Sequence, residues 1–274
     1  MYGAILGDII GSVYEGDRHN VKHKDFPLFA ENSRFTDDTL MTIAIADGIM
    51  NAGMTDDVDL LKKALVQSMQ KFGRKYPDIG YGPRFRKWIF SDNPEPYYSY
   101  GNGAAMRVSS IAWLYQNDFN MMRTAARASA EVTHNHLESV KAAEATSCII
   151  FMANRGENKQ AISNYVKEEF GYNLDSSCDE IRPNYHFDVS CQGTMPPAIM
   201  SFLEGCNFED VIRTAISLGG DSDTIGAIAG GMAEAYYGIP KRLIDECRKR
   251  LDRELLDVVD RFTDVLKRMR KNGG

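Results

Sequence analysis

Two carboxylates stand two residues apart directly after a glycine pair, in the stretch Gly219-Gly220-Asp221-Ser222-Asp223-Thr224. The small apolar residues that follow, 225–233, suit a helix packed closely against its neighbours, although its glycines lower helix propensity. Asp221 and Asp223 would then lie at the start of that helix. There they could cap it and favour its dipole, or they could ligate a divalent cation with hard oxygen atoms. This stretch alone leaves both interpretations open.

A calcium EF-hand is excluded, because Ile225 occupies the fifth loop position and Met232 stands where the bidentate Glu is required. The same chemistry recurs far upstream in Thr36-Asp37-Asp38, which also precedes an apolar helical segment. Thr55-Asp56-Asp57 repeats those letters but leads into a charged amphipathic segment. We interpret that third copy as a plain helix cap.

Composition limits the class of protein. The 274 residues are 43% hydrophobic and 26% charged, which is ordinary for a globular chain with a sizeable core. The net charge of −6 argues against a nucleic-acid partner, which needs a basic surface. Five scattered cysteines without metal-ligand spacing favour reduced thiols and a cytoplasmic location. A secretion signal and an apolar run long enough for a membrane span are both lacking, so no membrane partner is expected.

Helical spacing of apolar residues recurs along the chain, and no alternating pattern predicts a strand. The segment 171–192 is the least regular. We therefore predict an all-α protein, with residues 1–274 forming a single compact multi-helical domain. The expected helices, besides the one that follows Asp221, are 2–14, 37–52, 56–73, 83–88, 104–116, 119–132, 137–154, 157–169, one capped by Thr194, one capped by Asn207, one opened by Pro240, and 252–269.

Five motifs together resemble the ADP-ribosylglycohydrolase family, which includes the dinitrogenase reductase-activating glycohydrolases and the eukaryotic ADP-ribosyl-acceptor hydrolases. They occur in order over about residues 2 to 238: Gly3-Ala4-Ile5-Leu6-Gly7-Asp8, Phe35-Thr36-Asp37-Asp38-Thr39, Gly101-Asn102-Gly103-Ala104-Ala105-Met106-Arg107, Thr133-His134 and Leu218-Gly219-Gly220-Asp221-Ser222-Asp223-Thr224-Ile225-Gly226. The resemblance implies an all-helical domain with two Mg²⁺ or Mn²⁺ ions in a cleft.

The resemblance also implies the ligands of these ions. Thr36, Asp37 and Asp38 would bind one ion, while Asp221, Asp223 and Thr224 would complete the pair. The chemistry of the residues agrees, because four carboxylates can share a pocket only if cations offset their repulsion. Oxygen ligands favour Mg²⁺ or Mn²⁺ over zinc.

By the same resemblance, Glu15 after the first helix is the catalytic carboxylate that reaches the substrate ribose. Cleavage of a glycosidic bond needs acid–base help at the anomeric carbon; whether Glu15 acts as base, acid or ribose clamp stays open. His134 resembles a substrate-contacting histidine, for a ribose or a phosphate. The expected substrate-binding turn, whose backbone N–H groups could hold a diphosphate, consists of Ser99, Tyr100, Gly101, Asn102, Gly103 and Met106, with Gly82 in a second such loop.

We therefore expect a hydrolase that cleaves the glycosidic bond between ADP-ribose and an acceptor, such as a modified protein side chain. Two alternatives remain: a non-catalytic ADP-ribose-binding member, and a hydrolase of a small ADP-ribose ester or nucleotide. The complete set of expected oxygen ligands and Glu15 favours the enzyme. The expected partner is ADP-ribose or an ADP-ribosylated substrate, and the expected oligomeric state is a monomer. The acceptor linkage is left open, whether to arginine, serine, a base or a small ester.

Overall fold

Helices form all the regular structure of residues 1–272, the part of the chain that the computed structural model describes, so the prediction of an all-α fold is confirmed. Within that range an isolated bridge joins Gly101 to Ser190, and no β-strand forms. The helices are α1 (Tyr2–Gly11), α2 (Asp37–Asn51), α3 (Val58–Lys75), α4 (Pro83–Ile89), α5 (Gly103–Met106), α6 (Ser109–Leu114), α7 (Phe119–Glu131), α8 (Leu137–Asn154), α9 (Lys159–Phe170), α10 (Cys178–Ile181), the 3₁₀ turn η1 (Arg182–Asn184), α11 (Cys191–Glu204), α12 (Phe208–Ser217), α13 (Ser222–Tyr237), α14 (Lys241–Arg248) and α15 (Arg253–Asn272).

Several helix boundaries differ from the sequence prediction, and two of them have a clear physical cause. The helix expected over 104–116 is divided into α5 and α6 at Arg107, whose buried side chain donates a hydrogen bond to the backbone oxygen of Ser129 on α7. The helix expected to be capped by Thr194 is capped four residues earlier, because the Ser190 hydroxyl accepts the N–H of Gly193. A contact with another helix accompanies the first boundary, and a local cap sets the second.

The second Thr-Asp-Asp, at 55–57, is a helix cap, as predicted. The carboxylate of Asp57 accepts the N–H groups of Asp59 and Leu60, both at 3.0 Å, at the start of α3. Asp56 beside it is exposed. The Asp57 carboxylate stabilises the start of α3. The exposed Asp56 offers a matched control for the other Thr-Asp-Asp.

Helices α1 and α13 come from opposite ends of the chain and touch backbone to backbone. A Cβ atom added at Gly7 would lie 2.0 Å from the backbone oxygen of Gly226, and one added at Gly3 would lie 2.1 Å from that of Gly230. The glycines recur every four residues on each helix, so they form one continuous stripe. This stripe brings the N-terminal helix against the helix that follows Asp221.

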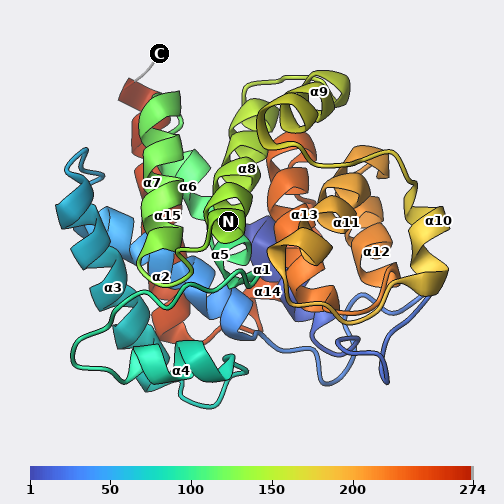
Figure 1. The fold of residues 1–274 in the computed structure, drawn as a ribbon, viewed down its shortest axis with the longest axis horizontal. Coiled ribbons are helices and arrows are strands. Elements are labelled where there is room, and N and C mark those ends of the chain that lie inside the picture. Colours follow the sequence, from blue (N-terminus) through green and yellow to red (C-terminus); the bar gives the residue numbers. More distant parts are fainter. Residues whose placement is uncertain (273–274) are drawn as a thin grey trace.

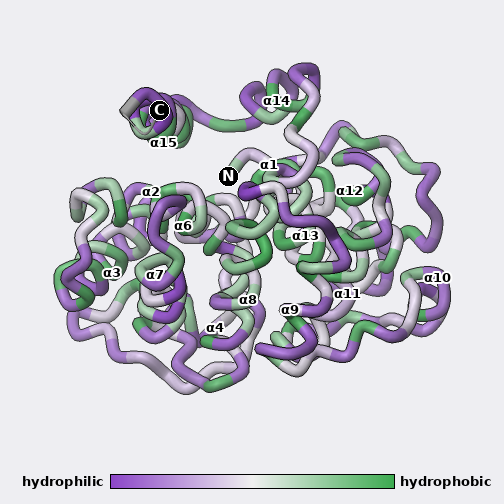
Figure 2. Tube along the Cα trace, turned by 90° about the horizontal axis from the view of Figure 1, so that it is seen from above, coloured by the Kyte–Doolittle hydropathy of each residue, from purple (hydrophilic) through white to green (hydrophobic). Residues whose placement is uncertain are grey.

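The α1–α13 pair lies in the middle of the molecule, as seen in Figures 1 and 2. Helices α2, α3, α6 and α7 lie on one side of it, and α10, α11 and α12 lie on the other. Helix α15 packs along α2, where Arg261 donates to the buried Asp47 carboxylate at 2.5 Å. The starts of α2 and α13 and the loops around residues 76–82 and 97–103 line a cavity between the two sides.

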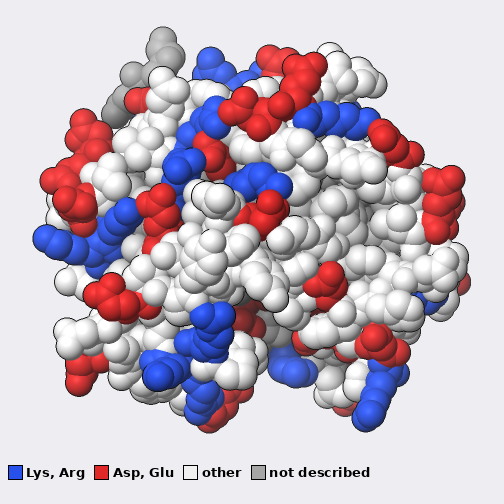
Figure 3. All heavy atoms as spheres, viewed as in Figure 1, with Lys and Arg blue, Asp and Glu red and all other residues white. Residues whose placement is uncertain are grey.

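The outer surface carries charges of both signs. On the face shown in Figure 3, Lys and Arg are interspersed with Asp and Glu, and they form no continuous basic stripe there. Within residues 1–272, no helix is both long enough and apolar enough to cross a bilayer.

Candidate active site

A cavity of about 1130 Å³ opens between the two sides of the molecule. That is enough room for a ligand the size of a dinucleotide. Its wall gathers almost all the residues that the sequence predicted for the site: Glu15, Thr36, Asp37, Asp38, Gly82, Ser99, Gly101, Asn102, Gly103, Met106, His134, Asp221, Asp223 and Thr224. Tyr100 does not line the cavity; its ring is 55% exposed and lies 5.7 Å from that of His136.

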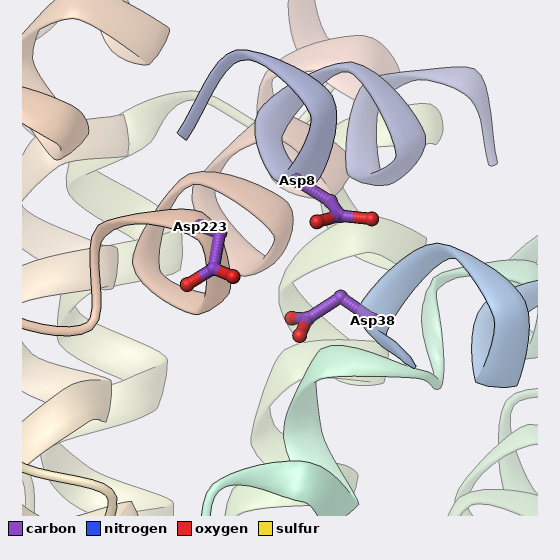
Figure 4. A group of neighbouring side chains, drawn as sticks. All are labelled: Asp8, Asp38 and Asp223. Atoms are coloured by element: carbon purple, nitrogen blue, oxygen red, sulfur yellow. The ribbon is translucent and has the colours of Figure 1, made fainter. Parts of the chain in front are cut away.

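Three helices each direct one carboxylate to the same point at the floor of the cavity. Asp8 from α1, Asp38 from α2 and Asp223 from α13 each offer a carboxylate oxygen, and these oxygens lie within 4.8 Å of one another. Figure 4 shows the three side chains pointing toward one another. Asp38 and Asp223 line the cavity, and Asp8 lies beneath them. All three side chains are buried. Asp8 was not among the predicted site residues, although a lone Asp within the apolar helix Tyr2–Gly11 was a signal that could have identified it.

Asp8 also fixes the start of α2. Its Oδ1 accepts the hydroxyl of Thr36 at 2.7 Å, and its Oδ2 accepts the backbone N–H groups of Thr36 at 2.9 Å and Thr39 at 3.0 Å. Both oxygens are therefore satisfied within the protein. Because Thr36 is the N-cap of α2, Asp8 sets the position of the following residues Asp37 and Asp38.

The hydrogen bonds of Asp221 do not support a capping role for its side chain. Asp221 occupies the N-cap position of α13, but its side chain makes no capping hydrogen bond. Instead its Oδ2 accepts the amide of Asn102 at 2.6 Å, and that amide also donates to Thr194 Oγ1 at 3.0 Å. Asn102 therefore orients the Asp221 carboxylate toward the cavity, where both residues contribute to the lining.

Glu15 joins this side of the cluster from the loop after α1. Its carboxylate lies within 4.8 Å of ligand atoms of Asp221 and Asp223, although Glu15 is otherwise exposed. Burial and the negative charges of Asp221 and Asp8 raise the pKa of Glu15. Glu15 is thus placed both to exchange protons at the cavity floor and to contribute to a group of metal ligands.

The carboxylates of the floor repel one another. Burial, followed by the charge of Asp8, raises the pKa of Asp37 to about 7. Burial and neighbouring carboxylates also raise the pKa of Asp38 and of Asp223 well above the usual range of Asp. Such a cluster is costly to hold ionised unless positive charge enters it.

The donor set fits divalent cations. Asp38 Oδ1 is buried and has no hydrogen-bond partner within residues 1–272, and its Oδ2 is bonded only to the Thr224 hydroxyl, at 3.3 Å. A buried carboxylate oxygen without a partner is destabilising unless a cation or a proton satisfies it. Carboxylate and hydroxyl oxygens are ligands for Mg²⁺ or Mn²⁺. The residues present can therefore hold such ions.

The glycine-rich turn offers fewer free N–H groups than its sequence suggests. The N–H of Gly101 donates to Ser99 Oγ at 3.1 Å, and that of Asn102 donates to the backbone oxygen of Val189 at 2.8 Å. The imidazole of His134 lies directly beside the turn, since a Cβ added at Gly103 would be 3.3 Å from its Nε2 atom. The side chain of His134 is therefore a candidate donor beside the turn.

An all-helical fold with a carboxylate-rich floor in a deep cleft defines a class of site suited to divalent cations and a polar ligand. A family model described as ADP-ribosylglycohydrolase matches residues 1–272. The chain belongs to the ADP-ribosylglycohydrolase family, and it is therefore an enzyme of the hydrolase class.

Individual relatives agree with this assignment. The human ADP-ribosylhydrolase ARH3 is 27% identical over 86% of this chain and 84% of its own length. The ADP-ribosylarginine hydrolase Tri1 of Serratia proteamaculans is 26% identical over 90% of this chain and 73% of its own length. A solved structure described as an ADP-ribosylglycohydrolase-related protein complex superposes with a TM-score of 0.70 at 25% identity, covering 97% of this chain and 95% of its own.

Proposed function

We propose that this enzyme releases ADP-ribose from an acceptor by hydrolysis, using two divalent cations, Mg²⁺ or Mn²⁺, held at the cavity floor. The observation that carries the proposal is the convergence of buried carboxylates from α1, α2 and α13, of which those of α2 and α13 line one large cleft. The names of the ARH3 and Tri1 relatives support ADP-ribose as the common part of the substrate.

In this proposal two segments divide the ligand atoms. Oxygens of Thr36, Asp37 and Asp38 hold one cation, while those of Asp221, Asp223 and Thr224 complete the pair. Asp8 positions the first segment through its hydrogen bonds to Thr36 and Thr39. When bound, the cations would offset the carboxylate charge and act as Lewis acids toward ribose oxygens.

Hydrolysis requires that a water oxygen bonds to the anomeric carbon while the bond to the acceptor breaks. The attacking water loses a proton, and the leaving acceptor gains one. Glu15 is the carboxylate with both a raised pKa and access to solvent, so we assign it this proton exchange. The diphosphate would extend toward the glycine-rich turn and His134, which line the same cavity.

The test is release of ADP-ribose from serine-linked, arginine-linked and small ester substrates, with Mg²⁺, with Mn²⁺ and with excess chelator. Chelation should abolish release, and either ion should restore it. Asp37→Asn should lower turnover by about 10²-fold or more, because it removes a ligand of the proposed metal site. Asp56→Asn is the matched control and should leave turnover near wild type.

Three results would contradict this proposal. Full activity in excess chelator would remove the role of the cations. An Asp56→Asn variant that folds normally yet is as inactive as Asp37→Asn would place the site at the other Thr-Asp-Asp. No release from any acceptor, together with intact ADP-ribose binding measured by calorimetry, would indicate a binding protein instead of an enzyme of this reaction.

A further inference from the structure

A buried arginine lies beneath the cavity without an acidic partner. Arg107 is 1% exposed, yet it contributes to the cavity lining. Its Nη2 donates to the backbone oxygen of Ser129 and to Thr133 Oγ1, both at 2.6 Å. Within residues 1–272 no carboxylate forms an ion pair with it, and its Nε has no hydrogen-bond partner. A buried charge without an ion pair is unfavourable, so the hydrogen bonds that Arg107 makes to its neighbours need a reason.

The hydroxyl of Thr133 links this arginine to His134. Thr133 Oγ1 lies 2.8 Å from His134 Nδ1 and 3.5 Å from the backbone oxygen of Ala130. Arg107 can only donate, so the Thr133 oxygen accepts from it and keeps one proton to give. The Ala130 oxygen already accepts the N–H groups of Thr133 and His134, at 3.0 and 2.8 Å. The contact to that oxygen is also long, at 3.5 Å, so His134 Nδ1 at 2.8 Å is the better acceptor for the hydroxyl proton.

An imidazole that accepts at Nδ1 carries its proton on Nε2 when it is neutral. Burial, and then the charges of Arg107 and Arg84, hold the pKa of His134 well below its usual range, so the ring stays neutral. The aromatic rings of Phe85 and Tyr97 also lie beside it, at 6.2 and 5.2 Å between centroids. Its Nε2 lies next to Gly101 and Gly103 of the cavity wall.

We propose that Arg107 and Thr133 are positioning residues that fix His134 as a neutral hydrogen-bond donor, with its Nε2–H directed to an oxygen of the bound ligand. This donor would compensate for the backbone N–H groups of Gly101 and Asn102 that are already used within the protein. The same arrangement prevents His134 from acting as a base at Nε2. Only the identity of the ligand, ADP-ribose, rests on the proposed function.

The test combines nitrogen NMR with calorimetry. Protein with ¹⁵N-labelled histidine is examined without ligand from about pH 6 to 8, the range in which an ordinary histidine titrates, and the signal of His134 is assigned by its loss in His134→Gln. We expect Nε2 to be protonated and Nδ1 unprotonated throughout. Thr133→Val, which removes the hydroxyl, should give a mixture of tautomers and weaken ADP-ribose binding about tenfold; Thr133→Ser should retain both properties.

A proton on Nδ1 in the wild-type protein would overturn the proposal. So would a Thr133→Val variant with an unchanged tautomer and unchanged affinity. Thermal melting of each variant controls for folding, and rescue by Thr133→Ser separates the hydroxyl from a general packing effect. The NMR measurement needs neither ligand nor turnover. A wild-type protein that fails to bind ADP-ribose would therefore reject the proposed function, while the tautomer would still be decided.

Discussion

Substitution of Gly7 by Ala tests whether the α1–α13 contact positions the active site. In an open helix this change is favourable by about 1 kcal/mol, because Ala is the better helix former. Here the new Cβ would lie 2.0 Å from the backbone oxygen of Gly226 and 2.1 Å from its carbonyl carbon, whereas ordinary contact begins near 3.4 Å. Neither partner is a flexible side chain, so the two helices would have to separate by about 1 Å or more.

The expected cost follows from that separation. Overpacking a core costs about 1–3 kcal/mol, and a clash between two backbones belongs at the upper end of this range. Subtracting the gain in helix propensity leaves a net destabilisation of about 2 kcal/mol. At about 2–4 °C per kcal/mol, the melting temperature should fall by about 4–8 °C. Asp8 on α1 and Asp223 on α13 should also move apart, so affinity for Mn²⁺ should decrease.

The assay is thermal unfolding together with calorimetric titration of Mn²⁺. Gly231→Ala on α13 is the matched control, because its new Cβ would meet side-chain atoms, at 3.1 Å from Ser109 and 3.4 Å from Ile150. That variant should remain near wild type in both measurements. A Gly7→Ala protein as stable as wild type, with unchanged Mn²⁺ affinity, would refute the reasoning that backbone contact along this stripe holds the cluster together.

Two further predictions concern the carboxylates. In metal-free folded protein, the pKa of Asp37 is raised to about 7. Between about pH 4 and pH 7 the folded state therefore binds more protons than the unfolded state. The free energy of unfolding should fall as the pH rises through this range. Denaturant titrations of chelator-treated protein should show that slope, and an equally steep slope in Asp37→Asn would contradict it. Glu15→Gln should bind ADP-ribose within about tenfold of wild type but lower turnover by about 10²-fold or more, as measured by calorimetry and single-turnover release. Lost binding with unchanged turnover at saturation would make Glu15 a clamp for the ribose.

Much of the site was predictable because its chemistry is local in sequence. A hydroxyl beside paired carboxylates identified Thr36–Asp38 and Asp221–Thr224, and the structure places both segments in one cavity. Asp8 was not assigned to the site, although it ends the first of the five motifs, because no hydroxyl or second carboxylate stands beside it in the apolar helix to suggest ligation. Tyr100 shares the glycine-rich motif yet lies outside the cavity lining, since adjacent residues in a turn point in different directions.

The sequence by itself determined the helical class, most helix positions and the types of ligand atom, because periodicity and capping act over a few residues. It also separated the Asp57 cap from the acidic site, since the segment after each motif differs. Only the tertiary structure decided which N–H groups of the glycine-rich turn are free and how Arg107, Thr133 and His134 connect. Those features depend on contacts between segments far apart in the chain, which close packing fixes and local sequence does not encode.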